Sequence, residues 1–371
     1  MSDLVLPTEL LPRDGRFGCG PSKVRPEAVE RLRSVAGELL GTSHRQPRVK
    51  DQVRRLQEGI GALFGLPEGY EVLVTVGGAT AFWDAAAFGL VERRARHYVF
   101  GEFSGKFAKA TAAAPWLDDP EVVSVDPGSL PVATAAPGCD VQAFTHNETS
   151  TGVMQAPARI DDALVMVDAT SGAGGLPVDL ADVDVYYFSL QKGFASEGGL
   201  TVAIVSPAAL ARIEAIAATD RYVPAFFDLA TVVDNSRKHQ TYNTPSVSTV
   251  FLGAEQVDWM LATFGDLDGV VAAQRSKAAS LYDWATAASY ATPFVTDADA
   301  RSLVVGTIDL DDDVSADEVN GVLRANGVLD TDAYRKLGRN QIRVGMFPAV
   351  DAADVEAYTA CVDWVVERLG G

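Results

Sequence analysis

The chain has 371 residues, of which 47% are hydrophobic, and its formal net charge at pH 7 is −19. This length and composition are typical of a globular protein with two domains and a large core. The negative charge repels nucleic acid and anionic membranes, so neither is an expected partner, and an anionic small substrate must be met by a local group of positive side chains.

The cysteine spacing and the N-terminal composition bear on the compartment. Cys19, Cys139 and Cys361 are widely separated and odd in number, so neither a disulfide framework nor a metal site is expected. Residues 1–15 hold acids and prolines where a signal peptide needs a basic start and an apolar run, and no later segment is apolar for the length that a bilayer requires. The sequence therefore predicts a cytoplasmic protein with an N-terminal arm at residues 1–15.

After this arm, a Gly- and Pro-rich entry at residues 16–24 leads to two predicted helices, at about 26–40 and 49–64. The loop between them holds His44 and Arg45. A guanidinium can bind phosphate or carboxylate through two parallel charge-assisted hydrogen bonds. A solvated basic loop is an equally good interpretation of this segment alone.

A strand, a glycine turn and a helix are predicted over residues 71–92. The turn is Gly77-Gly78-Ala79-Thr80. Free N–H groups and the positive end of the helix dipole attract an anion at such a helix start, so Ala79 and Thr80 are candidates to hold a cofactor phosphate. Many turns of this kind bind nothing. The next strand, at 97–100, ends near Phe103, whose ring can stack on a flat cofactor or simply pack in the core.

Two later strands place an acid and an amine at the same edge of the predicted sheet. The run 164–167 ends in Asp168, and the run 183–190 ends in Gln191 and Lys192. A pyridoxal-phosphate enzyme requires this pair, because a lysine bonds to the cofactor aldehyde and a carboxylate keeps the ring nitrogen protonated. Taken alone, the pair is more commonly a strand-end acid and a solvated loop lysine.

A dinucleotide-binding fingerprint is not expected in the glycine-rich turn at residues 172–175. Pro177 occupies the place where the last glycine of that fingerprint would open a helix, which counts against a nicotinamide-dependent dehydrogenase.

The remaining pattern predicts two domains. Strands and helices alternate to about residue 260, which is typical of a mostly parallel sheet with helices on both faces, so we expect a large domain at 16–264. Thr244 is the predicted N-cap of a helix at 246–264, with Pro245 at its first position. Helices and strands from residue 265 predict a smaller α+β domain at 265–371. Arg343 lies in an apolar strand there, and an incoming carboxylate would be a suitable partner.

Taken in order, these segments resemble the phosphoserine aminotransferases, a family of class-V aminotransferases within the fold-type I pyridoxal-phosphate enzymes. The likeness runs over nearly the whole chain. The matching pieces are 17–21 (Phe-Gly-Cys-Gly-Pro), 43–45 (Ser-His-Arg), 77–79 (Gly-Gly-Ala), 147–149 (Asn-Glu-Thr), Asp168, 191–192 (Gln-Lys), 243–245 (Asn-Thr-Pro) and Arg343.

The resemblance implies an α/β fold, with a mostly parallel sheet in a large domain that binds pyridoxal 5'-phosphate and a smaller C-terminal α+β domain. It implies Lys192 and Asp168 as catalytic residues. The other roles it implies are Ala79, Thr80 and Gln191 at the cofactor phosphate, Phe103 on the ring face, Thr149 at the ring hydroxyl, Arg343 at the substrate α-carboxylate, and His44 with Arg45 at its far anionic end.

In the family, the Asn243–Thr244 pair reaches the cofactor of the other subunit, which implies a homodimer with shared sites. The implied reaction is transamination between L-glutamate and 3-phosphohydroxypyruvate, giving 2-oxoglutarate and O-phospho-L-serine in L-serine biosynthesis.

This chain departs from the family pattern in three places, which bear on the choice of substrate. Phe103 stands where many relatives have Trp, no Arg follows the glycine turn, and residues 344–348 differ from the usual Ala-Ser-x-Tyr-Asn. Arg335 is a further candidate for the substrate phosphate.

The nearest alternative function is another class-V aminotransferase, of the serine- or alanine-glyoxylate type, with a non-phosphorylated acceptor. A cysteine desulfurase would need His where Gln191 stands. A non-catalytic binding protein of the same fold is a further alternative, although the retained Lys192 and Asp168 argue against it.

Overall fold

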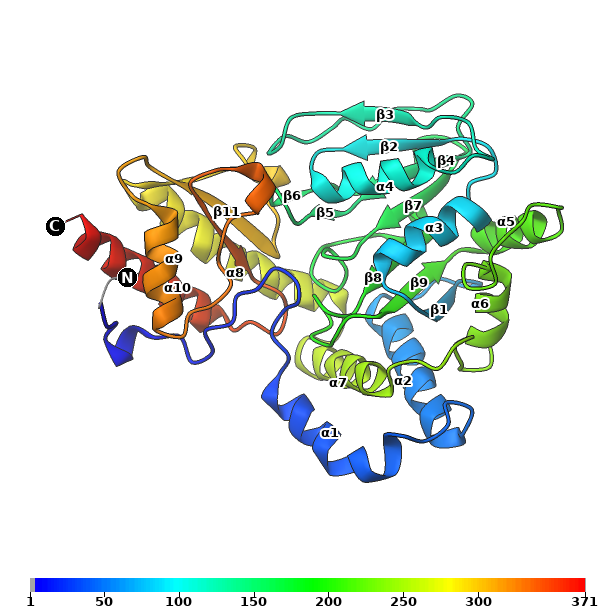
Figure 1. Cartoon of the computed structure of the whole chain (residues 1–371), viewed down its shortest axis with the longest axis horizontal. Helices are drawn as coiled ribbons and strands as arrows, with labels where there is room; N and C mark the ends of the chain where they lie inside the picture. The colour runs from blue at the N-terminus through cyan, green and yellow to red at the C-terminus, as the bar shows by residue number, and fades with distance from the viewer. Residues whose placement is uncertain (1–3, 371) are drawn as a thin grey trace.

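A seven-stranded sheet forms the centre of the larger part of the molecule in a computed structural model that describes residues 4–370 (Figure 1). The strand order is β1-β9-β8-β7-β4-β2-β3. The pairs from β8 to β3 are parallel, whereas β9 runs antiparallel to both β8 and β1. The strands are β1 (Glu71–Val76), β2 (Ala95–Val99), β3 (Glu121–Ser124), β4 (Val141–Thr145), β7 (Leu164–Asp168), β8 (Val185–Ser189) and β9 (Leu200–Val205). The predicted α/β fold with a mostly parallel sheet is thus confirmed.

Helices cover both faces of this sheet, which explains why its central strands are apolar without alternation. On β8, Tyr186 and Phe188 pack toward one face, and Val185 and Tyr187 pack toward the other. The first face is covered by α2 (Pro47–Leu63) and α7 (Val247–Phe264). The second face is covered by α3 (Ala79–Gly89), α4 (Glu102–Ala112), α5 (Pro207–Ala217) and α6 (Leu229–Ser236). The helix α1 (Pro26–Leu39) precedes α2, and a short hairpin of β5 (Asn147–Glu148) and β6 (Val153–Met154) follows β4.

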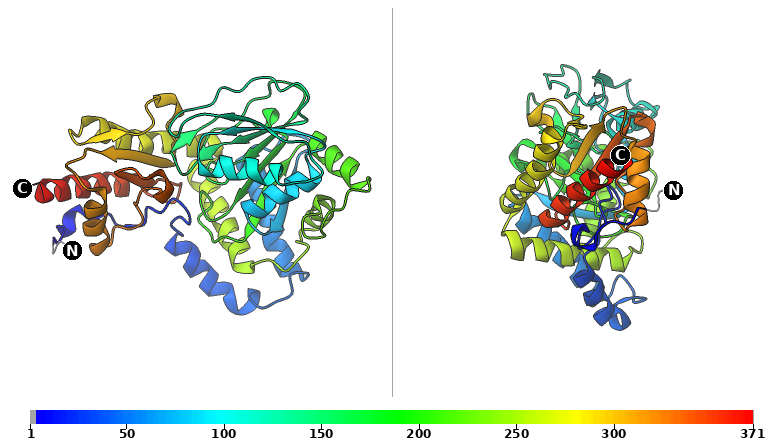
Figure 2. Two further views of the ribbon diagram at one scale, coloured as in Figure 1. Left: turned by 45° about the horizontal axis from the view of Figure 1, so that its top comes forward. Right: turned by 90° about the vertical axis from the view of Figure 1, so that its left-hand side faces the viewer.

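The smaller part contains a three-stranded antiparallel sheet, β10-β11-β12. Its elements are α8 (Leu267–Ala287), β10 (Ala291–Pro293), β11 (Val305–Leu310), α9 (Ala316–Ala325), β12 (Gln341–Gly345) and α10 (Ala352–Leu369). The described start of the chain lies along α9 and α10, on the same side of the molecule as the end of α10 (Figure 2). The backbone N–H of Arg13 donates to Asp354 Oδ1 at 2.8 Å, and Phe17 N–H donates to the carbonyl of Leu329 at 3.2 Å.

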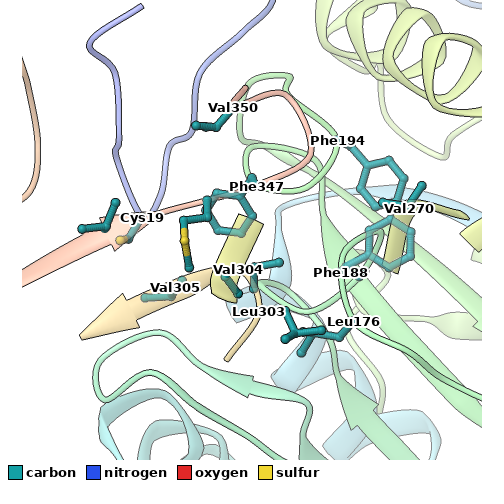
Figure 3. Packing of buried hydrophobic residues seen from close by; sticks show 14 of the residues in the cluster. Cys19, Leu176, Phe188, Phe194, Val270, Leu303, Val304, Val305, Phe347 and Val350 are labelled. Atoms are coloured by element: carbon teal, nitrogen blue, oxygen red, sulfur yellow. The ribbon is translucent and has the colours of Figure 1, made fainter. Parts of the chain in front are cut away.

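The two parts share one hydrophobic core at their junction. Figure 3 shows Leu303 and Val304 of the smaller part beside Leu176 of the larger part. Cys19 of the entry segment lies in the same cluster as Phe347. The domain limits at 16–264 and 265–371 remain a prediction.

Two local predictions were wrong. The N-cap of α7 is Ser246, whose Oγ accepts the N–H of Thr249, so Thr244 and Pro245 lie before the helix rather than at its first residues. Ser246 is the better cap because its hydroxyl is one turn from that free N–H. Phe103 lies in the first turn of α4 rather than at a strand end.

Between residues 4 and 370, no helix is both long and apolar enough to cross a membrane. The cytoplasmic location predicted from the sequence remains a prediction.

Candidate active site

A cavity of about 450 Å³ opens at the carboxyl ends of β1, β4, β7 and β8. This edge of a parallel sheet is the usual position of ligand sites in α/β proteins. The predicted cofactor residues that line the cavity are Ala79, Thr80, Phe103, Thr149, Asp168, Gln191 and Lys192.

Lys192 lies in the turn after β8 and is buried, with 8% of its surface exposed. Its Nζ donates to Thr149 Oγ1 at 2.9 Å and lies 5.3 Å from the centroid of the Phe103 ring. Burial lowers the pKa of the Lys192 amine to about 8, because the charged form loses its hydration. An amine with this pKa has a substantial neutral, nucleophilic fraction near physiological pH.

The entry segment holds the Lys192 turn closely. Ser22 Oγ donates to the carbonyl of Lys192 at 2.6 Å, and Ser22 N–H donates to that of Gln191 at 2.8 Å. Gly20 has a φ of +140°, and a Cβ there would lie 2.6 Å from Lys192 Cε. The left-handed φ and the close approach of the lysine side chain both favour glycine at position 20.

A chain of hydroxyl groups continues from the lysine. Thr149 Oγ1 donates to Ser171 Oγ at 2.8 Å, and Ser171 Oγ donates to the carbonyl of Asn147 at 2.9 Å. Asn147 Nδ2 also donates to Ser171 Oγ at 2.9 Å. The residues of this hydrogen-bonded series are buried, so the series fixes the Thr149 hydroxyl close to the Lys192 amine.

Asp168 ends β7 as predicted and is 5% exposed. Its Oδ1 accepts the N–H of Thr170 at 3.0 Å, and its Oδ2 accepts the indole N–H of Trp83 at 2.8 Å. A carboxylate has about four acceptor positions, so capacity remains for a ligand in the cavity.

The start of α3 forms an anion cradle at another side of the cavity. Gly77 and Gly78 have φ values of 122° and 78°, which favour glycine. The N–H of Ala79 donates to Ser189 Oγ at 2.8 Å, so a second hydroxyl lies beside Thr80 at this helix start. Backbone N–H groups and hydroxyls at a helix N-terminus suit a phosphate.

Three buried polar atoms in the cavity wall support the presence of a ligand. Asn147 Oδ1, Thr170 Oγ1 and Gln191 Oε1 have no hydrogen-bond partner among residues 4–370. Since buried polar atoms are normally paired, these atoms suit a polar ligand. An amine, a carboxylate, an aromatic face and an anion cradle in one cavity fit pyridoxal 5'-phosphate.

Phe103 reaches the cavity because Glu148 caps α4. The buried carboxylate of Glu148 accepts the N–H of Phe103 at 3.1 Å and that of Ser104 at 2.9 Å. Negative charge at a helix N-terminus is favourable, so this carboxylate sets the position of the first turn and of the Phe103 ring.

A second cavity, of about 670 Å³, shares Gly20 and Pro21 with the first and is lined by Arg335 and Arg343. Arg343 Nη1 donates to the carbonyl of Thr149 at 3.0 Å, which links the two cavities, and its buried Nε has no hydrogen-bond partner within the described chain. Arg335 also lines this cavity without a carboxylate partner in residues 4–370, whereas Arg339 nearby pairs with Asp309. Two guanidinium groups are thus available to an anionic substrate.

The other predicted site residues lie together but line neither cavity. Thr244 Oγ1 and His44 Nδ1 are in hydrogen-bond contact at 3.2 Å, and Arg45 Nη1 donates to Gln240 Oε1 at 2.6 Å. The segments before α2 and before α7 therefore form one polar group, which we call the basic-loop cluster: His44, Arg45, Gln240, Asn243 and Thr244.

Sequence reasoning missed Trp83, Ser171 and Ser189. Trp83 lies in an apolar helix, where the pattern indicates only a core residue. Ser189 is a polar residue ending an apolar strand two positions before Gln191, and that signal was available.

Comparisons with known proteins agree with this geometry. The family profile described as "Aminotransferase class-V" matches residues 121–331. "Phosphoserine aminotransferase" of Nocardioides sp. (strain ATCC BAA-499 / JS614) is 57% identical over 371 residues, covering 99% of each chain. "Phosphoserine aminotransferase" of Corynebacterium glutamicum (strain R) is 56% identical over 366 residues, covering 98% of this chain and 97% of the relative.

Among solved structures, a phosphoserine aminotransferase from Cytophaga hutchinsonii superposes with a TM-score of 0.87 at 24% identity, covering 95% of this chain and 99% of the other. At that identity the superposition shows the fold alone, whereas the full-length relatives above show the family.

Proposed function

This chain belongs to the phosphoserine aminotransferases, within the class-V aminotransferases, and from that premise we propose how its own residues carry out the reaction. It is a transferase that uses pyridoxal 5'-phosphate. It passes the amino group of L-glutamate to 3-phosphohydroxypyruvate, giving 2-oxoglutarate and O-phospho-L-serine in L-serine biosynthesis. The full-length relatives named for this activity do not favour the glyoxylate-type alternative. The observation that carries the proposal is the placement of Lys192 and Asp168 in one cavity with an anion cradle.

The cavity of about 450 Å³ is the proposed cofactor site. Pyridoxal phosphate, when bound there, supplies an aldehyde that takes up the amino group and a ring that accepts electrons from the substrate α-carbon. We assign Asp168 to the ring nitrogen, Thr149 to the ring hydroxyl and Phe103 to the ring face. Ala79, Thr80 and Gln191 are assigned to the cofactor phosphate.

Lys192 is assigned two tasks, covalent attachment of the cofactor and proton transfer at the substrate α-carbon. Both need the neutral amine, which the lowered pKa of about 8 makes available near neutral pH. The hydrogen bond to Thr149 at 2.9 Å keeps the amine directed into the cavity rather than toward the core.

Arg343 is assigned to the substrate α-carboxylate, because its buried Nε is unpartnered within the described residues and its Nη1 contacts Thr149 at the cofactor cavity. Arg335, which has no carboxylate partner in residues 4–370, is a candidate for the substrate phosphate. Because no Arg follows the glycine turn of this acidic chain, an anionic substrate depends on these two arginines for positive charge.

We further propose a homodimer with shared sites. The basic-loop cluster lines neither cavity of its own chain, although its residues match family positions that reach a cofactor and a substrate anion. In a two-fold dimer, the same cluster can serve the site of the other protomer. His44 of the partner subunit and Arg45 of the partner subunit would then meet the far anionic end of the substrate.

The test is the absorbance of the purified protein, first with pyridoxal phosphate, then with L-glutamate, then with keto acids. We expect a visible band that L-glutamate removes and that 3-phosphohydroxypyruvate restores. Recovery with glyoxylate or pyruvate, and none with the phosphorylated acid, would replace this function with the glyoxylate-type alternative. A protein that never develops the band would contradict the role of Lys192.

A further inference from the structure

Trp83 makes a specific polar contact that a core aromatic residue does not require. It lies one turn after Ala79 on α3 and is 6% exposed. Its indole N–H donates to Asp168 Oδ2 at 2.8 Å, while its ring stacks on Phe107 with centroids 6.1 Å apart and planes at 21°. The stacking fixes the ring, and the ring fixes the direction of the N–H.

Asp168 has two well-formed donors besides any ligand. Oδ1 accepts the backbone N–H of Thr170 at 3.0 Å, and the indole N–H on Oδ2 is the side-chain donor. The buried hydroxyl of Tyr187 lies close to both Asp168 and Trp83, but it makes no well-formed hydrogen bond within residues 4–370. Two fixed donors, one on each oxygen, hold a carboxylate more firmly than either alone.

The same helix also carries the anion cradle at its first residues, Ala79 and Thr80. One rigid element therefore bears both the proposed phosphate site and the donor that orients Asp168. The polar groups of a binding site are held precisely when the residues that orient them are themselves fixed by packing on a helix or strand. Trp83 meets this condition.

We propose that Trp83 is a positioning residue, whose indole N–H holds the Asp168 carboxylate in the orientation that meets the ring nitrogen of pyridoxal phosphate. This proposal rests on the proposed function, because it assumes that the cofactor binds in this cavity. It adds a residue on α3 to the groups that set the contact between Asp168 and the ring nitrogen.

The test uses two ligands that differ only at the ring nitrogen: pyridoxal phosphate and its analogue with C–H in place of that nitrogen. The dissociation constants of both are measured by equilibrium dialysis against the cofactor-free protein. Their ratio, analogue over cofactor, reports the contact between Asp168 and the ring nitrogen. In Trp83→Phe, which keeps an aromatic ring but removes the donor, we expect this ratio to fall about tenfold, since a hydrogen bond to a charged group is strong.

Trp116→Phe is the matched control. Trp116 also donates its indole N–H, to the carbonyl of Ala87 at 3.1 Å, and also stacks on a phenylalanine, Phe88, at 4.3 Å. It does not line the cofactor cavity. Its removal should leave the ratio at the wild-type value.

An unchanged ratio in Trp83→Phe would overturn the proposal, as would a rise, which would mean that Trp83 competes with the cofactor for Asp168. If the wild-type protein binds neither ligand, the proposed function itself fails. Should Trp83→Phe not fold, wild-type protein with ¹⁵N-labelled indoles replaces it, with the Trp83 signal assigned by substituting each of the other tryptophans. That signal should shift more with pyridoxal phosphate than with the analogue, and equal shifts would overturn the proposal.

Discussion

Two buried lysines show how the surroundings of a side chain decide its role. Burial lowers the pKa of Lys192 to about 8 and that of Lys277 to about 7. Lys277 Nζ donates to Gln274 Oε1 at 2.7 Å and to the carbonyl of Phe347 at 3.1 Å, inside the smaller part of the molecule. Lys192 instead faces a cavity. Both amines have a lowered pKa, but of the two lysines only Lys192 lines a cavity in which it can meet a ligand.

The first prediction concerns the pH dependence of cofactor capture. Only the neutral amine attacks an aldehyde, so the capture rate of the cofactor-free protein should rise with pH around a midpoint of about 8. Stopped-flow absorbance measures this rate. Lys192→Ala should abolish capture, whereas Lys106→Ala should not, although Lys106 Nζ also lies 5.5 Å from the Phe103 ring. A midpoint near the ordinary lysine value would contradict the burial argument.

The second prediction concerns Lys277 and stability. Its pKa is lowered from 10.5 to about 7, so between these pH values the unfolded chain binds more protons than the folded protein, and stability rises with pH. This residue should add a slope of up to about 1.4 kcal/mol per pH unit in that window. The substitution Lys277→Met removes the titration of the Lys277 amine and leaves that of Lys192 in place. Urea unfolding should show the free energy of unfolding, wild type minus variant, increasing from pH 7 to pH 10, and a flat difference would refute it.

At the residue scale, the sequence could predict the catalytic candidates that directly follow an apolar strand. Asp168 and Lys192 were identifiable because each follows an apolar run, and the structure brings both to one cavity. Trp83 was not identifiable, since its contact with Asp168 joins a helix to a strand that is distant in sequence. Thr244 was wrongly chosen as a cap because Ser246, two residues later, competes for the same role.

At the scale of elements, the start of α4 depends on a residue from another hairpin. Glu148 of β5 accepts the first N–H groups of α4, and Gly101 leaves room for it. The sequence analysis did not predict α4, although local signals were available: Gly101 is the N-cap, Glu102 is an acid in the first turn, and Ser104 Oγ accepts the N–H of Gly101 at 3.1 Å. Other missed elements are short or at an edge, such as β3, β10 and the eight-residue α6, where a few residues give too little periodicity.

The third prediction tests this arrangement with two glycines. In Gly101→Ala, the new Cβ would lie 2.3 Å from Glu148 Cγ, which displaces the carboxylate and with it the Phe103 turn. We expect a loss of about 2 kcal/mol in the free energy of unfolding, as for other overpacked sites, together with weaker binding of pyridoxal phosphate. Urea unfolding and dialysis measure the two effects.

The control lies in the same helix. In Gly105→Ala, the Cβ would lie 3.7 Å from Val99 Cγ1, an ordinary contact. Alanine is favoured over glycine in a helix by about 0.5–1 kcal/mol, so this variant should be more stable than the wild type and bind the cofactor as before. Equal losses in both variants would show that Glu148 has no special part in placing α4.

At the scale of the whole molecule, the chain has a net charge of −19, and the cavity lined by Arg335 and Arg343 also has three aspartates in its wall, Asp317, Asp330 and Asp332. Long strands and helices were predictable because their apolar patterns are continuous, and so was the layered α/β architecture. The grouping of His44 with Thr244 was not, because it depends on how the loop before α2 packs against the loop before α7. In the proposed homodimer, the question is whether this group serves the cavity of its own chain or that of the other protomer.

The fourth prediction decides that question with mixed dimers. Lys192→Ala protein is combined with the Asn243→Ala/Thr244→Ala double variant by joint refolding. If the cluster serves the other protomer, each hybrid dimer has one site with both defects and one site with neither. Random pairing makes half of the dimers hybrids, so the mixture should recover about one quarter of wild-type activity, although each parent is nearly inactive.

Combining Lys192→Ala with Asp168→Asn is the control. Both residues line the cavity of their own chain, so every site of that mixture is impaired and no recovery is expected. If the cluster acts within its own chain, the first mixture will be as inactive as the control, and the shared-site dimer is wrong.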